Sequence, residues 1–184
     1  MTAGEMVQLN NLTRTNQGCK LHPTTNERAV NLMGYTHYFT KAAADRDDAL
    51  RFEMFARGAR TIIEYATTQD NIKIANAMGD NLGKWEITDE VVAFNGFGAD
   101  SHESFYWSTK SDGFDFCKTA YKPYDAVVTA CLIHLKDVYG DLVEIGSDGS
   151  WSDWALGARL YRNATGLTAE NFLKREEMTG VKSE

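Results

Sequence analysis

The chain is poor in cysteine and proline and has no long apolar segment. Its 184 residues contain three cysteines, an odd and widely spaced set that argues against a disulfide framework and fits a reducing compartment. The longest strongly apolar run, 126–135, contains a histidine and is far too short to span a bilayer. We therefore expect no association with a membrane.

The sequence also lacks an internal repeat, a Pro/Gly/Ser-rich linker, and an N-terminal basic start followed by an apolar segment. The last absence predicts that there is no signal peptide, and the default location is then the cytoplasm. The other two favour one domain, which at this length buries a sizeable core. We expect a flexible arm over 1–20, a single globular domain over 21–178 and a frayed end over 179–184.

The net charge is −7, and the acids are concentrated in two segments. Seven acids and two lysines lie between Trp85 and Thr119, and five acids with no Lys or Arg lie between Asp137 and Asp153. Phosphate-backbone binding needs clustered Lys and Arg, so we do not expect nucleic acid as a partner. A basic protein partner is compatible with this charge.

The periodicity of apolar residues predicts the secondary structure. One continuous apolar stripe predicts a helix over 47–66, and a wide apolar face predicts a buried central helix over 123–139. Shorter helices are expected over 24–34, 69–83, 152–166 and 168–178. Aromatic and β-branched residues predict strands over 84–97, 103–110, 114–119 and 141–145. The fold class is therefore α+β, a small antiparallel sheet packed against four or five helices.

The stretch that most resembles a site is GSDGSWSDW, residues 146–154. As a calcium loop starting at Asp148 it fails, because positions 6 and 12 are Asp153 and Arg159 in place of Gly and Glu. As a phosphate loop it lacks a lysine, and its aspartates would repel the ligand. Ser150 followed three residues later by Asp153 instead predicts a helix cap.

Metal ligation is not predicted. Cys19 and His22 have zinc-ligand spacing, but the second half of such a site is missing, and His37 and His102 stand alone in the sequence. We therefore expect neither a metal nor another cofactor.

The segment Asp115–Tyr161 resembles a recurrent segment of small uncharacterised proteins encoded by tailed bacteriophages. The shared pattern combines "FCKTA-KPYD", an apolar helix and "SDG-W-DW" before a final helix, and the helix Ala56–Thr67 resembles the same group. The resemblance covers about two-fifths of the chain. It implies a phage origin, expression in the host cytoplasm and an accessory role toward a host component, and it transfers no functional residues.

The leading interpretation is a small soluble phage-encoded accessory protein that binds a host protein, in host takeover or against host defence. Large aromatic side chains often anchor protein interfaces. We therefore expect the contact surface either in the acidic, aromatic middle, 85–107, or at the tryptophan edge of 146–154. The aromatic residues expected there are Trp85, Phe105, Trp107, Trp151 and Trp154.

The competing interpretation is a small enzyme or a nucleotide- or nucleic-acid-binding protein, with a pocket flanked by 118–125 and 147–154. Lys118 or Lys122 would neutralise an anionic ligand, and acid–base work would fall to Asp125, Asp148 or Asp153. Aspartates that only accept hydrogen bonds from backbone N–H groups would weaken this interpretation. A homodimer is compatible with an aromatic content of 11%, although no feature specifies one.

Overall fold

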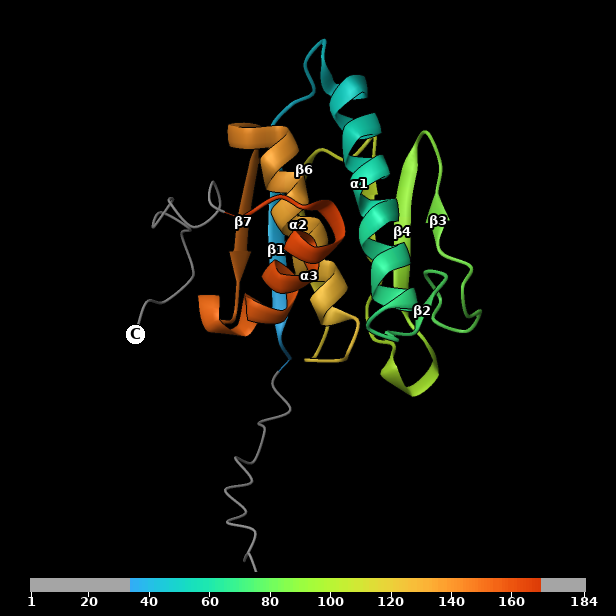
Figure 1. The fold of residues 1–184 in the computed structure, drawn as a ribbon. Helices are drawn as coiled ribbons and strands as arrows, with labels where there is room; N and C mark the ends of the chain where they lie inside the picture. Colours follow the sequence, from blue (N-terminus) through green and yellow to red (C-terminus); the bar gives the residue numbers. More distant parts are fainter. Residues whose placement is uncertain (1–33, 170–184) are drawn as a thin grey trace, which may run out of the picture. The chain divides into compact units, whose positions relative to one another are not determined.

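A computed structural model describes residues 34–169 (Figure 1). The predicted arm, the first and last predicted helices and the frayed end lie almost entirely outside these residues. The described part is an α+β domain with three α-helices and two small antiparallel sheets, which confirms the predicted fold class. No helix in this part is long and apolar enough to cross a membrane.

The first sheet has the strand order β6-β1-β7, with β1 (Thr36–Lys41) between β6 (Gly113–Lys118) and β7 (Val143–Ser147). Both neighbours are antiparallel to β1, and the register pairs Tyr38 with Phe116 and with Gly146. Side chains therefore alternate between two faces. The inner face carries the buried residues His37, Phe39, Lys41, Cys117, Val143, Ile145 and Ser147.

The second sheet is built around β4 (Val91–Gly96), which pairs with β2 (Ile74–Ala75), β3 (Glu86–Ile87) and β5 (Phe105–Ser108). The strand expected over 103–110 is present as β5, whereas the single strand expected over 84–97 is divided by a turn into β3 and β4, which pair antiparallel with each other. The expected strand over 114–119 is also present, as β6, but it pairs with β1 and not with β5. The loop before β5 contains a short 3-10 helix, η1 (Gly98–Asp100).

Three helices pack against one another and against the sheets. They are α1 (Asp48–Thr68), α2 (Asp125–Tyr139) and α3 (Ala155–Thr165), and each contacts the other two. Helix α2 also contacts β7, and α1 contacts β4 (Figure 1). Two further 3-10 helices connect the elements, η2 (Gly140–Leu142) before β7 and η3 (Trp151–Trp154) before α3.

Aromatic rings join the two sheets in one core. Phe39 of β1 packs against Phe105 and Trp107 of β5, with ring centroids 5.8 and 5.9 Å apart, and Phe55 of α1 packs on the same two rings. Tyr139 of α2 meets Trp107 edge-on at 5.5 Å. Phe105 and Trp107 are completely buried, so they are core residues.

A buried ion pair borders this core. Lys41 Nζ lies 2.8 Å from Asp48 Oδ2, and both side chains are almost inaccessible to solvent. The same ammonium group lies 5.7 Å from the centre of the Trp107 ring and 5.5 Å from that of Tyr139. This pair links the end of β1 to the first turn of α1.

The helix predicted over 69–83 is wrong. Asn71, Gly79 and Gly83 have positive φ, which interrupts any helix, and the backbone instead makes turns around β2. Ile74 and Ala75 are buried by pairing with β4, so the apolar residues that suggested a helix face belong to a short strand.

Candidate functional site

The two segments predicted to flank a pocket, 118–125 and 147–154, meet at the start of β1 around His37. This imidazole is completely buried. Its Nε2 lies 2.8 Å from Oδ1 of Asp125, the first residue of α2, and its Nδ1 lies 3.1 Å from Oγ of Ser147, the last residue of β7. One side chain thus joins two strands and a helix that are far apart in sequence.

The hydrogen bonds run in the order of a serine–histidine–carboxylate relay. A carboxylate only accepts hydrogen bonds, so we assign the proton to Nε2. In the neutral ring Nδ1 then accepts from the Ser147 hydroxyl, and Ser147 Oγ in turn accepts from Gly149 N at 3.1 Å. Thr119 Oγ1 also donates to Asp125 Oδ1, at 2.5 Å.

Aromatic rings enclose this relay. The rings of Tyr35 and Trp154 lie perpendicular to the His37 ring, with centroids 4.8 and 5.1 Å away. Burial raises the pKa of the Tyr35 phenol well above its usual value, so this residue is neutral at pH 7. Ser147 is only 5% exposed, so in this conformation its hydroxyl does not reach a substrate. The hydrogen bonds from Ser147 to His37 to Asp125 follow the order of a catalytic relay, but the Ser147 hydroxyl lacks the exposure that nucleophilic catalysis needs.

A strained turn covers Tyr35 from outside. Ala120 and Tyr121 have φ of 51° and 56°, and Lys122 N donates to Thr119 O at 3.0 Å, which is the geometry of a type I′ turn. Such turns favour Asn and Gly, and left-handed backbone costs other residues about 1–2 kcal/mol each. The Tyr121 ring stacks on Tyr35 at 3.8 Å and is 55% exposed.

The stretch 146–154 is a strand-to-helix turn, as predicted. Ser150 N donates to Asp153 Oδ2 at 2.7 Å, and the two residues form a capping box that starts η3. Asp148 Oδ2 accepts from Thr36 N at 3.0 Å. Two of the three aspartates considered for acid–base work thus accept hydrogen bonds from backbone N–H groups, and the third, Asp125, holds His37.

The outer face of the β6-β1-β7 sheet carries an exposed aromatic cluster that the sequence analysis did not single out. Phe114 is 64% exposed and Phe116 is 47% exposed. Their rings lie 6.2 Å apart, and the partly buried Tyr38 ring lies 6.1 Å from Phe114. We call this surface the outer sheet face; by strand register its members are Thr36, Tyr38, Thr40, Phe114, Phe116, Lys118, Glu144, Gly146 and Asp148.

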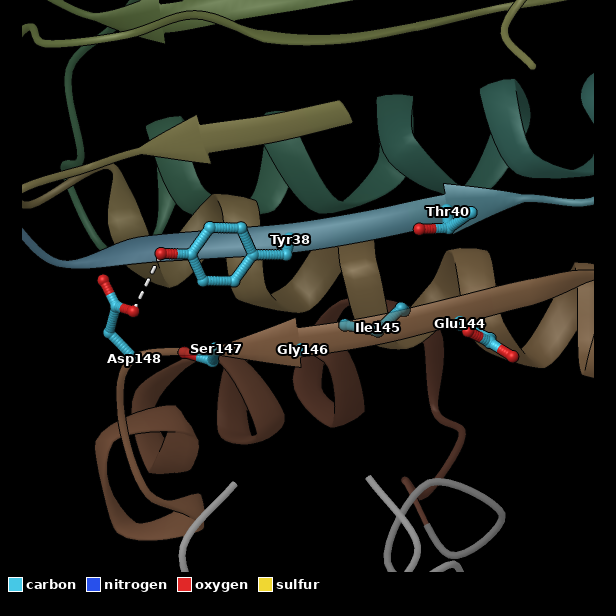
Figure 2. A pocket seen from close by; sticks show the side chains of 7 residues that line it. All are labelled: Tyr38, Thr40, Glu144, Ile145, Gly146, Ser147 and Asp148. Atoms are coloured by element: carbon cyan, nitrogen blue, oxygen red, sulfur yellow. Dashed lines mark hydrogen bonds between the residues drawn. The ribbon is translucent and has the colours of Figure 1, made fainter. Parts of the chain in front are cut away.

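A hollow lies on the outer sheet face between β1 and β7 (Figure 2). The Tyr38 hydroxyl points to Asp148 and donates to its Oδ1 at 2.9 Å, while Thr40 and Glu144 lie at the other end. The hydrogen bond to the Asp148 carboxylate is the main cause that raises the pKa of Tyr38. The hollow is lined by Tyr38, Thr40, Glu144, Ile145, Gly146, Ser147 and Asp148.

The predicted aromatic contact surface needs correction. Phe105, Trp107 and Trp154 are at most 1% exposed, because alternation along β5 and the packing of η3 turn them into the core. They are not available to anchor a partner. Trp85 and Trp151 are partly buried and pack on that core. Of the two tryptophans in 146–154, Trp154 is buried and Trp151 is partly buried, with its ring stacked on that of Trp154.

The two lysines predicted to neutralise an anionic ligand are placed differently. Lys122 Nζ donates to Ala99 O at 2.9 Å and so holds the strained turn against the loop before β5. Lys118 is partly buried on the outer sheet face, where its side chain lies directly against Gly34. Lys122 touches the His37 relay only through its backbone, where its carbonyl oxygen accepts from Asp125 N at 2.8 Å, and neither lysine side chain has a described hydrogen bond to the relay.

Comparison with known proteins gives no relative: no family model, no curated protein and no solved structure matches the chain. Among residues 34–169, no group of three or more His, Cys, Asp or Glu side chains is arranged to hold a metal ion. Function must therefore be argued from the outer sheet face and the His37 relay themselves.

Proposed function

We propose that this chain is a binding protein that recognises a partner protein through the outer sheet face. The observation that carries the proposal is the cluster of Phe114, Phe116 and Tyr38, three neighbouring aromatic rings on one strand pair with the two phenylalanines largely exposed. Exposing such rings to water is unfavourable unless another surface covers them. Aromatic anchors of this kind dominate the energetics of protein interfaces.

The charge around the cluster favours a protein over a nucleic acid. Exposed aromatic rings on an antiparallel sheet are also a platform for stacking single-stranded bases. Such platforms need neighbouring Lys and Arg, whereas the outer sheet face carries Glu144 and Asp148 against Lys118 alone. A bacterial host protein as the partner is part of this proposal and follows from the phage origin expected from the sequence.

A paired capture experiment tests the proposal. The chain, the double variant Phe114→Ser/Phe116→Ser and the control Leu156→Ser are each immobilised and exposed to host lysate. Leu156 is a matched control because it is 58% exposed on α3. We expect one protein at stoichiometric amount on the wild type and the control, and its loss from the double variant. Equal capture by all three, or capture by none, would contradict the proposal.

The order of the His37 relay supports a second candidate function, a serine hydrolase. Its burial opposes this function, since a nucleophile must meet the substrate. A fluorophosphonate probe distinguishes the two: labelling that is lost on Ser147→Ala would support the hydrolase. If no label is incorporated at Ser147, the relay has a structural role only.

A further inference from the structure

The outer sheet face has a gap in its side chains where β7 faces Tyr38. The residue paired with Tyr38 on β7 is Gly146, which has no side chain and so leaves the flank of the Tyr38 ring uncovered. This gap is the hollow of Figure 2. The hydrogen bonds from Tyr38 to Asp148 and from Thr36 N to Asp148 fix the ring and one end of the hollow.

The two carboxylates at the ends of the hollow differ in how many hydrogen bonds they can still accept from a ligand. Asp148 already accepts from Tyr38 and Thr36, and Lys118 lies in the same row across the sheet, beside Thr36. Glu144 lies at the other end and is exposed, and its carboxylate has no described hydrogen bond or ion pair within residues 34–169. Its neighbours across the sheet are Thr40 and Phe114, which are uncharged.

The segment that contains β7 is rich in acids, although Lys136, just before it, donates from Nζ to Val143 O at the start of β7. From Asp137 to Asp153 the chain has five acids and no Lys or Arg. The acids at both ends of the hollow favour a cationic ligand, flat enough to lie on a tyrosine ring and long enough to reach Glu144. A guanidinium group meets these requirements better than an ammonium group, because it stacks on aromatic faces and forms two parallel hydrogen bonds to a carboxylate.

We propose that the hollow between Tyr38 and Gly146 binds an arginine side chain of the partner protein, with Glu144 accepting from its guanidinium group. Phe114 and Phe116 then receive the apolar residues next to that arginine. This inference rests on the proposed function, since it assigns the partner's chemistry at the same surface.

The direct test is a titration of the full chain at low ionic strength, followed by ¹H–¹⁵N NMR. The probes are the peptide acetyl-Leu-Arg-Leu-amide and its citrulline counterpart, which has the same shape without the charge. We expect saturable shifts of the Tyr38, Thr40 and Gly146 amides with the arginine peptide, and at least tenfold weaker binding of the citrulline peptide. Equal binding of the two peptides, or shifts confined to other residues, would overturn the inference.

Variants locate the contact. We expect Glu144→Gln to weaken binding of the arginine peptide about fivefold, as for one exposed ion pair, and Tyr38→Leu to weaken it further. Glu64→Gln, an exposed acid on α1, is the matched control and should change nothing. If Glu144→Gln and Glu64→Gln weakened peptide binding equally, the effect would come from the net charge of the protein and would contradict an arginine site at Glu144. Shifts on the same amides with an oligothymidylate but not with the arginine peptide would also refute it, in favour of nucleic acid.

The two proposals fail in different ways. If a captured partner is lost on Phe114→Ser/Phe116→Ser but is held fully by Glu144→Gln and Tyr38→Leu, the arginine site is wrong and the proposed function stands. If the phenylalanine variant holds its partner, the proposed function itself is wrong.

Discussion

Replacing His37 by alanine should destabilise the domain more than any surface substitution, because three elements depend on this one ring. The change removes the hydrogen bonds at 2.8 Å to Asp125 and at 3.1 Å to Ser147. It also removes a ring that packs edge-on with Tyr35 and Trp154 and leaves a cavity in a completely buried position.

The size of the effect follows from these losses. Truncation of a large buried side chain costs about 2–5 kcal/mol, and a buried polar partner left without a hydrogen bond costs about 1–3 kcal/mol. Asp125 keeps the bond from Thr119, and Ser147 keeps the bond from Gly149 N, so the second cost is small. We expect the free energy of unfolding to fall by about 3–5 kcal/mol.

Urea denaturation followed by tryptophan fluorescence measures this change, since Trp154 lies against the substituted position. The midpoint should fall while the slope with urea stays the same. His102→Ala is the control, because that side chain is exposed and should change stability by less than about 0.5 kcal/mol. A loss below about 1 kcal/mol for His37→Ala would refute the view that this ring holds β1, β7 and α2 together.

Three further predictions concern the fold. Lys41→Met should destabilise by about 3–5 kcal/mol in the same assay because it leaves Asp48 buried without its partner, and adding Asp48→Asn should restore part of the loss; no recovery would contradict a buried ion pair. Burial lowers the pKa of His134 in the folded chain. As pH falls below about 6.5, the unfolded chain therefore binds a proton at this residue more readily than the folded chain, and the free energy of unfolding decreases. His134→Gln should flatten this pH dependence, and an unchanged slope would contradict the prediction. Ala120→Gly should raise the melting temperature slightly because glycine accepts positive φ, and a lower value would argue against strain in the turn.

The sequence predicted those parts of the fold in which apolar residues recur along one face of a long helix. The apolar stripe over 47–66 became α1, and the wide face over 123–139 became α2, because long amphipathic helices are specified by many residues at once. Strand β1 was not predicted. Its inward positions include His37 and Lys41, whose burial depends on Asp125, Ser147 and Asp48 far along the chain. No local pattern reveals such partners.

The candidate site was predicted only in part, for a similar reason. The convergence of 118–125 with 147–154 was expected, and the capping box of Ser150 and Asp153 followed from spacing alone. The exposed aromatic surface was expected either within 85–107 or at Trp151 and Trp154, yet alternation along β5 puts Phe105 and Trp107 inward and Trp154 is buried as well. The exposed rings of Phe114 and Phe116 could have been found from alternation in the strand they share, but which face is covered depends on the helices packed behind it.

Site-specific photocrosslinking tests the central claim most directly. A photoreactive phenylalanine analogue is introduced at Phe114 in one sample and at Leu156, on α3, in another, and each is irradiated in a lysate of the bacterium proposed as the host. We predict that a single partner protein is crosslinked from position 114 and not from position 156, and that free arginine-containing peptide in excess suppresses the product. A partner crosslinked only from position 156, or the same set of proteins from both positions, would contradict a binding function of the outer sheet face.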